Sequence, residues 1–273
     1  MWVKFFFVYF LAMSLRCMGQ PNITNSIGMQ FVLIDPGTVV IGEFNPPYPV
    51  PDDTVKSLPH DYIMWMGDGR SYNADEFRLA KEMAMRDSKP GFTARVSKSF
   101  YMATTEVTQA QWKKVMGYNR SRFEDDSLPV QNVSWNEANA FIKKLNRREK
   151  RKTYRLPTEV EWEYAARAGA QKDIPWKDIE ASANLNKKTP VRVGSKKPNA
   201  WGLYDMLGNV WEWVADYYNE ELFADPVPPK RGEQHVLKGA SFVGDVKNAT
   251  YMTHAGGPGN GWDVGFRIVM DVK

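Results

Sequence analysis

Cysteine is nearly absent from the sequence. Cys17 is the single cysteine among 273 residues, and it lies close to the N-terminus. A chain cleaved after Gly19 would contain no thiol. Disulfides, thiolate metal sites and cysteine nucleophiles are excluded for such a chain, because each of them requires a thiol.

The chain also has few histidines and a small net charge. The three histidines, His60, His235 and His254, are scattered and lack metal-ligand spacing, which argues against a histidine-bound zinc or iron site. The formal net charge is +4, and loss of Lys4 and Arg16 with an N-terminal leader would lower it by two, to +2. So small a charge gives no support to nucleic-acid binding.

Residues 1–19 have the features of a secretory signal. Lys4 precedes the apolar run Phe5–Met13, which is too short to span a bilayer comfortably, and Gly19 supplies a small residue at a cleavage point. We predict a signal peptide at residues 1–19, followed by one domain at residues 20–273 without a transmembrane segment.

Lipidation of Cys17 is an alternative to simple cleavage. Arg16 stands where a lipoprotein signal has a small residue, so we favour cleavage after Gly19. Either route predicts a secreted or periplasmic protein, and lipidation would add association with the outer membrane.

Aromatic residues and helix-capping patterns are abundant. The chain has 10 Trp, 12 Tyr and 14 Phe, which can fill a sizeable core. Three capping boxes begin at Thr108, Ser134 and Thr158 and predict helices over residues 109–116, 135–148 and 158–167, with Gly117 and Gly169 as C-terminal caps. A fourth helix is expected at Asn73–Asp87.

Strand and turn patterns occupy most of the remaining sequence. Residues 27–42 predict a hairpin around Asp35-Pro36-Gly37, and residues 44–60 predict a loop. Further strands are expected at residues 95–107, 190–194, 235–243 and 264–272, with a turn at 256–259. The combination predicts one compact domain with few helices and much irregular structure.

A basic run covers residues 143–152. Lys143, Lys144 and Arg147 begin it, and Arg148-Glu149-Lys150-Arg151-Lys152 completes it. A solvated helix end is the interpretation we favour, because the helix dipole attracts cations there. Nucleic acid, acidic lipid or a protein partner are the alternatives.

An irregular stretch at residues 202–213 suggests a cation site. Asp205 and Glu212 supply carboxylates, and the backbone carbonyls of Gly208 and Val210 fall between them. Calcium accepts such mixed oxygen ligands. The alternative is a buried aromatic loop whose two acids pair with arginine or cap backbone amides.

Six motifs together resemble the formylglycine-generating enzyme, or sulfatase-modifying factor, family. The motifs, which occur in the family's order, are Phe100–Trp112, Pro129–Trp135, Tyr154–Gly169, Gly202–Trp213, Leu237–Phe242 and Gly265–Arg267. The resemblance covers about residues 27–272. It implies a variant of the C-type-lectin fold, α+β, with a small twisted antiparallel sheet and a few flanking helices.

The resemblance also implies a lost catalytic centre. Family enzymes use oxygen and Cu(I), held by two cysteines, to convert the cysteine of a sulfatase Cys-x-Pro-x-Arg motif into formylglycine. The two cysteine positions correspond to Gly244 and Ala249 here, and Cu(I) requires soft sulfur ligands. Met252 is a nearby thioether but does not replace two thiolates. No copper is expected, although Ser241 and Trp211 still match residues of the family's pocket.

The resemblance strengthens the calcium prediction. A family calcium site uses positions that correspond to Asp205, Gly208, Val210 and Glu212. A second family site begins at Asn184-Leu185, but the loop that carries its other ligands is shortened here. We also expect Arg155, Glu161 and Arg167 to be buried or half-buried charge partners.

Three functions are compatible with these features. The first is a secreted or cell-envelope pseudoenzyme that acts as a calcium-stabilised binding or scaffold module for a protein partner, as in gliding or type IX secretion machinery. The second is an enzyme with divergent oxidative chemistry or a sulfatase-maturation role. The third is calcium-dependent glycan recognition, with Trp176, Trp201 and Trp262 as stacking residues.

Overall fold

The computed structural model describes residues 23–43, 91–150, 153–174, 176–224, 226–244, 249–257 and 259–272. The predicted signal peptide, the loop at 44–60 and the helix at 73–87 lie outside these residues. No helix within the described ranges is long and apolar enough to cross a membrane.

The three predicted helices with capping boxes are confirmed. They are α2 (Gln109–Met116), α3 (Trp135–Arg148) and α4 (Glu159–Arg167), and in each the capping hydroxyl accepts from the third helical N–H while that residue's side chain returns the bond. Gly117 caps α2 in the left-handed conformation as predicted. The cap of α4 is Ala168 rather than Gly169, so that prediction was wrong by one residue.

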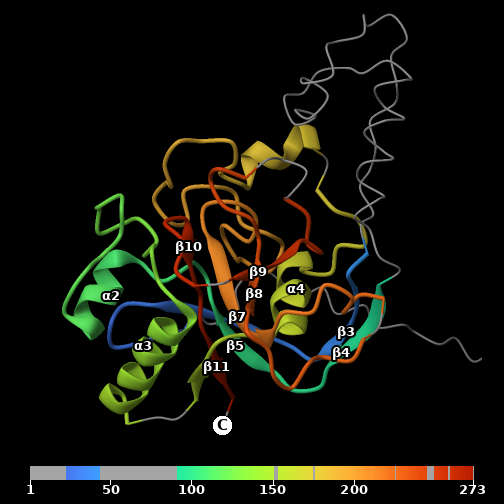
Figure 1. Cartoon of the computed structure of the whole chain (residues 1–273), viewed down its shortest axis with the longest axis horizontal. Helices are drawn as coiled ribbons and strands as arrows, with labels where there is room; N and C mark the ends of the chain where they lie inside the picture. Colours follow the sequence, from blue (N-terminus) through green and yellow to red (C-terminus); the bar gives the residue numbers. More distant parts are fainter. Residues whose placement is uncertain are drawn as a thin grey trace, which may run out of the picture.

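Eleven described strands form three sheets (Figure 1). The first has the order β1 (Ile23–Thr24), β2 (Gln30–Ile34), β5 (Phe100–Ala103), β11 (Val269–Asp271) and β6 (Tyr154–Arg155), all antiparallel. The second has the order β10 (Val264–Gly265), β7 (Trp211–Tyr217), β8 (His235–Lys238) and β9 (His254–Gly257), with β10 parallel to β7. The third pairs β3 (Gly37–Ile41) with β4 (Phe92–Val96).

The predicted hairpin at residues 27–42 is wrong, although both of its strands exist. Strand β2 pairs with β5 and strand β3 pairs with β4, so the chain crosses between two sheets at Asp35-Pro36. The strand predicted at 95–107 is broken in the same way at residues 97–99. The first and third sheets therefore each contain one strand from residues 27–42 and one strand from the region of residues 92–107.

Two other local predictions also fail. Residues 190–194 form no strand, and Gly256-Gly257, predicted to turn, lie in β9. A Cβ at Gly257 would lie 2.1 Å from the Trp213 ring, so glycine is required there for close packing rather than for a turn. Within the irregular stretch 202–213, the last three residues begin β7.

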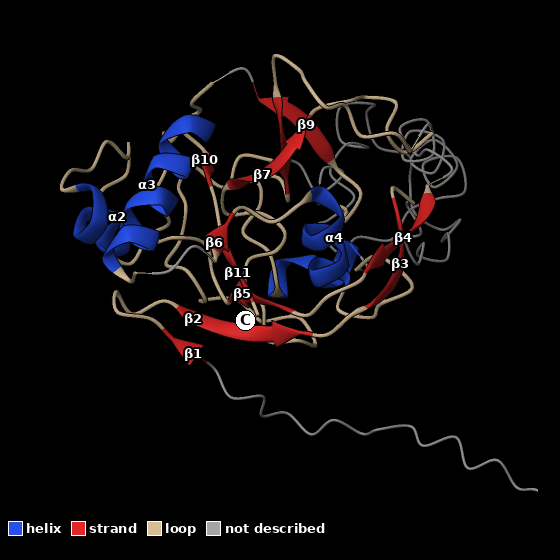
Figure 2. Ribbon diagram, turned by 90° about the horizontal axis from the view of Figure 1, so that it is seen from below, coloured by secondary structure: helices blue, strands red, loops and turns tan. Residues whose placement is uncertain are grey.

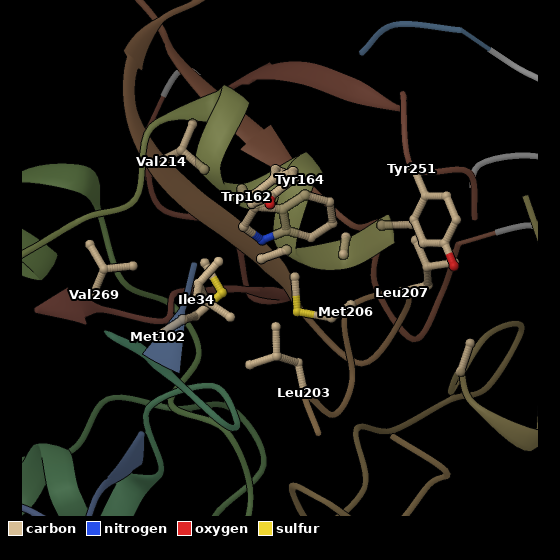
Figure 3. Packing of buried hydrophobic residues seen from close by; sticks show 14 of the residues in the cluster. Ile34, Met102, Trp162, Tyr164, Leu203, Met206, Leu207, Val214, Tyr251 and Val269 are labelled. Atoms are coloured by element: carbon tan, nitrogen blue, oxygen red, sulfur yellow. The ribbon is translucent and has the colours of Figure 1, made fainter. Parts of the chain in front are cut away.

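The main cores lie between the sheets and the helices. Helix α4 packs beside β3 and β4, while α2 and α3 lie together on the opposite side (Figure 2). Trp162 of α4 points toward Met206 of the irregular stretch (Figure 3), and both belong to the main core cluster together with Tyr164 and Leu203. The loop that carries the predicted cation ligands is therefore held from one side by α4.

Candidate functional site

Arg267 lies at the centre of a buried group of charged residues. Its Nε and Nη2 donate to the two oxygens of Glu212 at 2.7 and 2.6 Å. Trp162 Nε1 adds a third hydrogen bond to Glu212 at 2.7 Å. Arg267 and Glu212 are almost completely buried, so their charges are neutralised mainly by each other.

The surrounding strands fix this pair. Glu212 lies on β7 beside Gly265 of β10 and Lys238 of β8, and Arg267 follows β10 two residues later. The Arg267 guanidinium also donates to the carbonyl of Tyr204 at 2.9 Å, which ties it to the irregular stretch.

Two further carboxyls, from Glu106 and Asp205, lie beside Arg267. Asp205 Oδ2 accepts from Gly194 N at 2.7 Å, and Glu106 Oε1 accepts from the Asn209 side chain at 3.0 Å. The remaining oxygens, Asp205 Oδ1 and Glu106 Oε2, are buried and have no hydrogen-bond donor. The two carboxyls are within hydrogen-bonding reach of each other, but two ionised carboxylates have no proton to share.

Burial and mutual repulsion affect both acids. Burial, followed by the charge of Asp205, raises the pKa of Glu106 well above its usual value. Burial also raises the pKa of Asp205, against the lowering effects of the Gly194 N–H and Arg267. We name Arg267, Glu212, Asp205 and Glu106 the Arg267 cluster. It has three acids for one guanidinium, so it requires two protons or one divalent cation for neutrality.

The predicted calcium ligands fit this cluster in part. Asp205 offers a buried oxygen without a partner, as a ligand should. Glu212 does not, because Arg267 and Trp162 occupy its carboxylate. Gly208 lies directly against Asn184, where a Cβ would be 2.6 Å from the Asn184 carbonyl oxygen. No group of three or more His, Cys, Asp or Glu residues suited to a metal occurs in the described part of the chain.

Glu106 was missed as a site residue by sequence reasoning. It lies within the quoted motif Phe100–Trp112, and an acid between Thr105 and Val107 was the available signal. Its contact with Asn209 bridges 103 residues, which no local pattern reveals. At the doubted second site, Asn184 and Leu185 are buried, and the Asn184 amide donates to Thr189 O at 3.2 Å.

The residues that match the family's pocket come together at a second place. Ser241 Oγ donates to Asp263 Oδ2 at 2.7 Å, and Trp211 N donates to Asp263 O at 3.0 Å. Gly244 follows in a turn, with its N–H donating to Ser241 O at 2.8 Å. Ala249, the other cysteine position, is packed into the main core. Neither position presents a metal-binding side chain.

An exposed aromatic surface lies beside Ser241 and Asp263. Trp262 is 39% exposed, and its ring contacts Phe242 at 5.3 Å and Phe123 at 6.3 Å between centroids. The Arg122 guanidinium lies 4.7 Å from the Trp262 ring centroid, a cation–π distance. We name Arg122, Phe123, Val243 and Trp262 the Trp262 surface, since Val243 is also exposed.

The other two candidate stacking residues differ from Trp262. Trp201 is half-buried and packs against Tyr164 at 4.9 Å between ring centroids, so it serves the core. The side chain of Trp176 lies outside the described structure.

A second buried charge cluster surrounds α4. Arg167 donates to Glu163 Oε1 at 3.0 and 2.9 Å, and Lys238 Nζ lies 3.2 Å from Glu163 Oε2. Lys238 is also 3.7 Å from Glu159, which His254 contacts at 3.0 Å. We name these five residues the α4 cluster.

The structure also shows the contacts of the other charged residues and histidines considered in the sequence. Arg155 pairs with Glu161 through two bonds of 2.7 Å, and Arg167 is buried, as expected, although its partner is Glu163. His235 is stacked between Trp135 and Tyr217, at 3.7 and 4.3 Å between centroids. His60 lies outside the described residues.

The sequence match assigns the family. Residues 28–272 match the family described as "Sulfatase-modifying factor enzyme 1-like domain". The chain therefore belongs to this family, and its low helix content and curled antiparallel sheets agree with the predicted α+β fold.

Two curated proteins are similar to the chain in different ways. It is 34% identical over 161 residues to the formylglycine-generating enzyme of Mus musculus, covering 50% of this chain and 41% of that protein. It is 27% identical over 265 residues to "Chaperone protein LppX" of Paenibacillus barcinonensis, covering 74% of this chain and 91% of that protein. The chain thus spans less than half of the mouse enzyme but most of the chaperone.

A solved structure supports the fold alone. "Treponema denticola variable protein 1" superposes with a TM-score of 0.68 at 23% identity, over 93% of this chain and 100% of that chain. The likeness extends over nearly the whole of both chains.

Proposed function

We propose that the protein is a non-catalytic family member that binds a protein partner outside the cytoplasm. The observation that carries this proposal is the identity of the two positions that the family fills with copper-binding cysteines. They are Gly244, in a turn, and Ala249, in the core. Without a thiolate pair, Cu(I) has no soft ligands there, so the oxidase reaction has no metal centre.

The Trp262 surface is the proposed binding site. It combines exposed aromatic and apolar side chains with the Arg122 cation, the residue types that contribute most at protein interfaces. The adjacent Asp263 is half-buried and adds a carboxylate to this surface, while the buried Ser241 holds it in place through a hydrogen bond. The name of the LppX relative, a chaperone, is compatible with a protein partner.

We also propose that calcium stabilises the fold at the Arg267 cluster. Support comes from the two buried carboxylate oxygens without donors and from the excess of negative charge around Arg267. Asp205 and Glu106 would supply the carboxylate ligands, with the backbone carbonyls of Gly208 and Val210 completing an oxygen set that calcium accepts. In this arrangement Glu212 remains the partner of Arg267 instead of a ligand.

Mass spectrometry of a model peptide tests the absence of oxidase activity. A Cys-x-Pro-x-Arg peptide is incubated with the protein, Cu(I) and oxygen, beside a family member that retains both cysteines. We expect the relative to convert the thiol to an aldehyde and this protein to leave the peptide unchanged. Conversion by this protein would contradict the proposal.

Site-specific crosslinking tests the binding role. A photoreactive amino acid replaces Trp262 in one variant and Val40 in a control, two apolar residues that are 39% and 41% exposed. After irradiation in cells, we expect an adduct of discrete mass from position 262 only. The same adduct from both positions, or none from position 262, would exclude the Trp262 surface as the site.

A further inference from the structure

Six cations gather where α2 and α3 end. Lys143, Lys144, Arg147, Arg148 and Lys150 are exposed at the end of α3, and Lys114 is exposed on the last turn of α2. We name these six residues the basic end. Arg148 Nη1 donates to Lys114 O at 3.1 Å, so the two helices present their cations together.

Cations outnumber acids at the basic end. None of its six cations forms an ion pair with an acid in the part of the chain that the structure describes. Glu149 is the one acid between Ala138 and Lys150, and it accepts hydrogen bonds from Ser26 and Tyr154. The opposite face of α3 carries Phe141, Ile142 and Leu145 into the core, so the cations have no role in packing.

The N-terminal part of the chain reaches the structure at this same place. Ser26 N and Oγ donate to Glu149 Oε1 at 2.9 and 2.7 Å, and Lys114 Nζ donates to Ile27 O at 3.4 Å. Strand β1, which begins at Ile23, therefore lies on the side of α2 and α3 (Figure 2). From Cys17 to Ile23 the chain can extend about 20 Å at most.

We propose that the basic end rests on an anionic lipid bilayer in the chain anchored by a lipid on Cys17, the alternative to cleavage after Gly19. The proposal takes from the proposed function only the location outside the cytoplasm. Cys17 precedes Ile23 by six residues, so the bilayer that holds its lipid is within reach of the basic end. One lipid chain gives only marginal attachment, and a polybasic surface supplies the second contact that stable attachment requires.

Vesicle binding by the full-length protein tests this proposal. Sedimentation with phosphatidylcholine vesicles measures the contribution of the N-terminal segment, and vesicles that also contain phosphatidylglycerol measure the contribution of charge. We expect stronger binding to the anionic vesicles, with the excess removed by high salt. In the variant Lys143→Glu, Lys144→Glu, Arg147→Glu, the excess affinity for anionic vesicles should fall at least about tenfold, since each cation contributes roughly fivefold to that affinity.

A matched control separates this surface from overall charge. Lys188→Glu, Arg192→Glu, Lys197→Glu changes the net charge equally in another exposed segment, in which Val193 N donates to Ser127 O between α2 and α3. It should bind like the unchanged protein. Equal binding to both kinds of vesicle, equal losses in both variants, or tighter binding to duplex DNA than to anionic vesicles would overturn the proposal, whatever the crosslinking from position 262 shows.

Discussion

The α4 cluster and the Arg267 cluster use buried charge in different ways. In the α4 cluster, Glu159 and Glu163 face the cations Lys238 and Arg167, so positive and negative charges are equal in number. In the Arg267 cluster, three acids face one guanidinium. The α4 cluster leaves one carboxylate oxygen without a donor, Glu159 Oε2, and the Arg267 cluster leaves one on each of two facing acids.

This difference separates a structural network from a site that requires another positive partner. The α4 cluster joins α4 to β8 and β9, and its two acids are matched in number by the cations Lys238 and Arg167. The Arg267 cluster reaches neutrality only with two protons or one divalent cation on Asp205 and Glu106. Replacement of an acid by its amide should therefore destabilise the protein at Glu159 of the α4 cluster and stabilise it at Glu106 of the Arg267 cluster.

The largest effect is expected from Arg267→Leu. This change leaves Glu212 buried without its cation, and removal of one partner from a buried ion pair typically costs about 3–5 kcal/mol. Urea denaturation followed by tryptophan fluorescence measures the free energy of unfolding. Arg192→Ala, an exposed control, should change it by less than about 0.5 kcal/mol. A loss for Arg267→Leu as small as that of the control would show that the cluster does not support the fold.

A smaller, pH-dependent effect is expected from Glu159→Gln. Burial would raise the pKa of Glu159, but the hydrogen bond from His254 and the charges of Lys238 and His254 overcome burial and lower it. A carboxyl with a lower pKa in the folded state adds stability above its unfolded pKa and loses it as pH falls through the folded pKa. Glu159→Gln should therefore cost about 1–3 kcal/mol at neutral pH and less below about pH 4.

Asp216 provides the control for this pH dependence. It lies beside Glu159 and accepts from the Glu159 N–H at 2.6 Å, but burial raises its pKa. Its contribution has the opposite sign, since a carboxyl with a raised pKa destabilises the fold above that pKa. Thermal unfolding from neutral to acid pH should thus show a reduced acid loss for Glu159→Gln and none of that reduction for Asp216→Asn.

The smallest effect is expected from Glu106→Gln, and it tests the charge excess directly. Without calcium, the amide can donate to Asp205 Oδ1 and should stabilise the protein by about 1 kcal/mol. The same change should abolish the rise in Tm that calcium gives the unchanged protein over a chelator. Glu163→Gln should leave the calcium response intact, because Glu163 belongs to the α4 cluster. A calcium response that survives in Glu106→Gln would exclude Glu106 as a ligand.

Local chemistry made part of the fold predictable. Thr108, Ser134 and Thr158 each begin a helix because a capping box depends on residues only three apart. The strands on either side of Pro36 were also predicted, but their pairing was not. Their partners lie more than fifty residues away in sequence, and a turn signature cannot distinguish a hairpin from a crossing between sheets.

The candidate site was predictable to a similar extent. Asp205 and Glu212 were identified from one motif, and both do lie around Arg267. Whether Glu212 is a metal ligand or the partner of an arginine depends on the position of the Arg267 side chain, and Arg267 follows Glu212 by 55 residues in the sequence. That contact makes Glu212 the ion-pair partner of Arg267. It also places Arg267 beside Glu106, which belongs to a motif much earlier in the sequence.

Copper binding tests most directly whether this family fold has lost its oxidase centre. Cu(I) is titrated, in competition with a chromogenic chelator, into the Cys17→Ser protein and into the same protein carrying Gly244→Cys and Ala249→Cys. The account predicts no stoichiometric Cu(I) in the first protein and one equivalent in the second, because only the second has two thiolates at the family positions. One tightly bound Cu(I) in the Cys17→Ser protein would contradict the account.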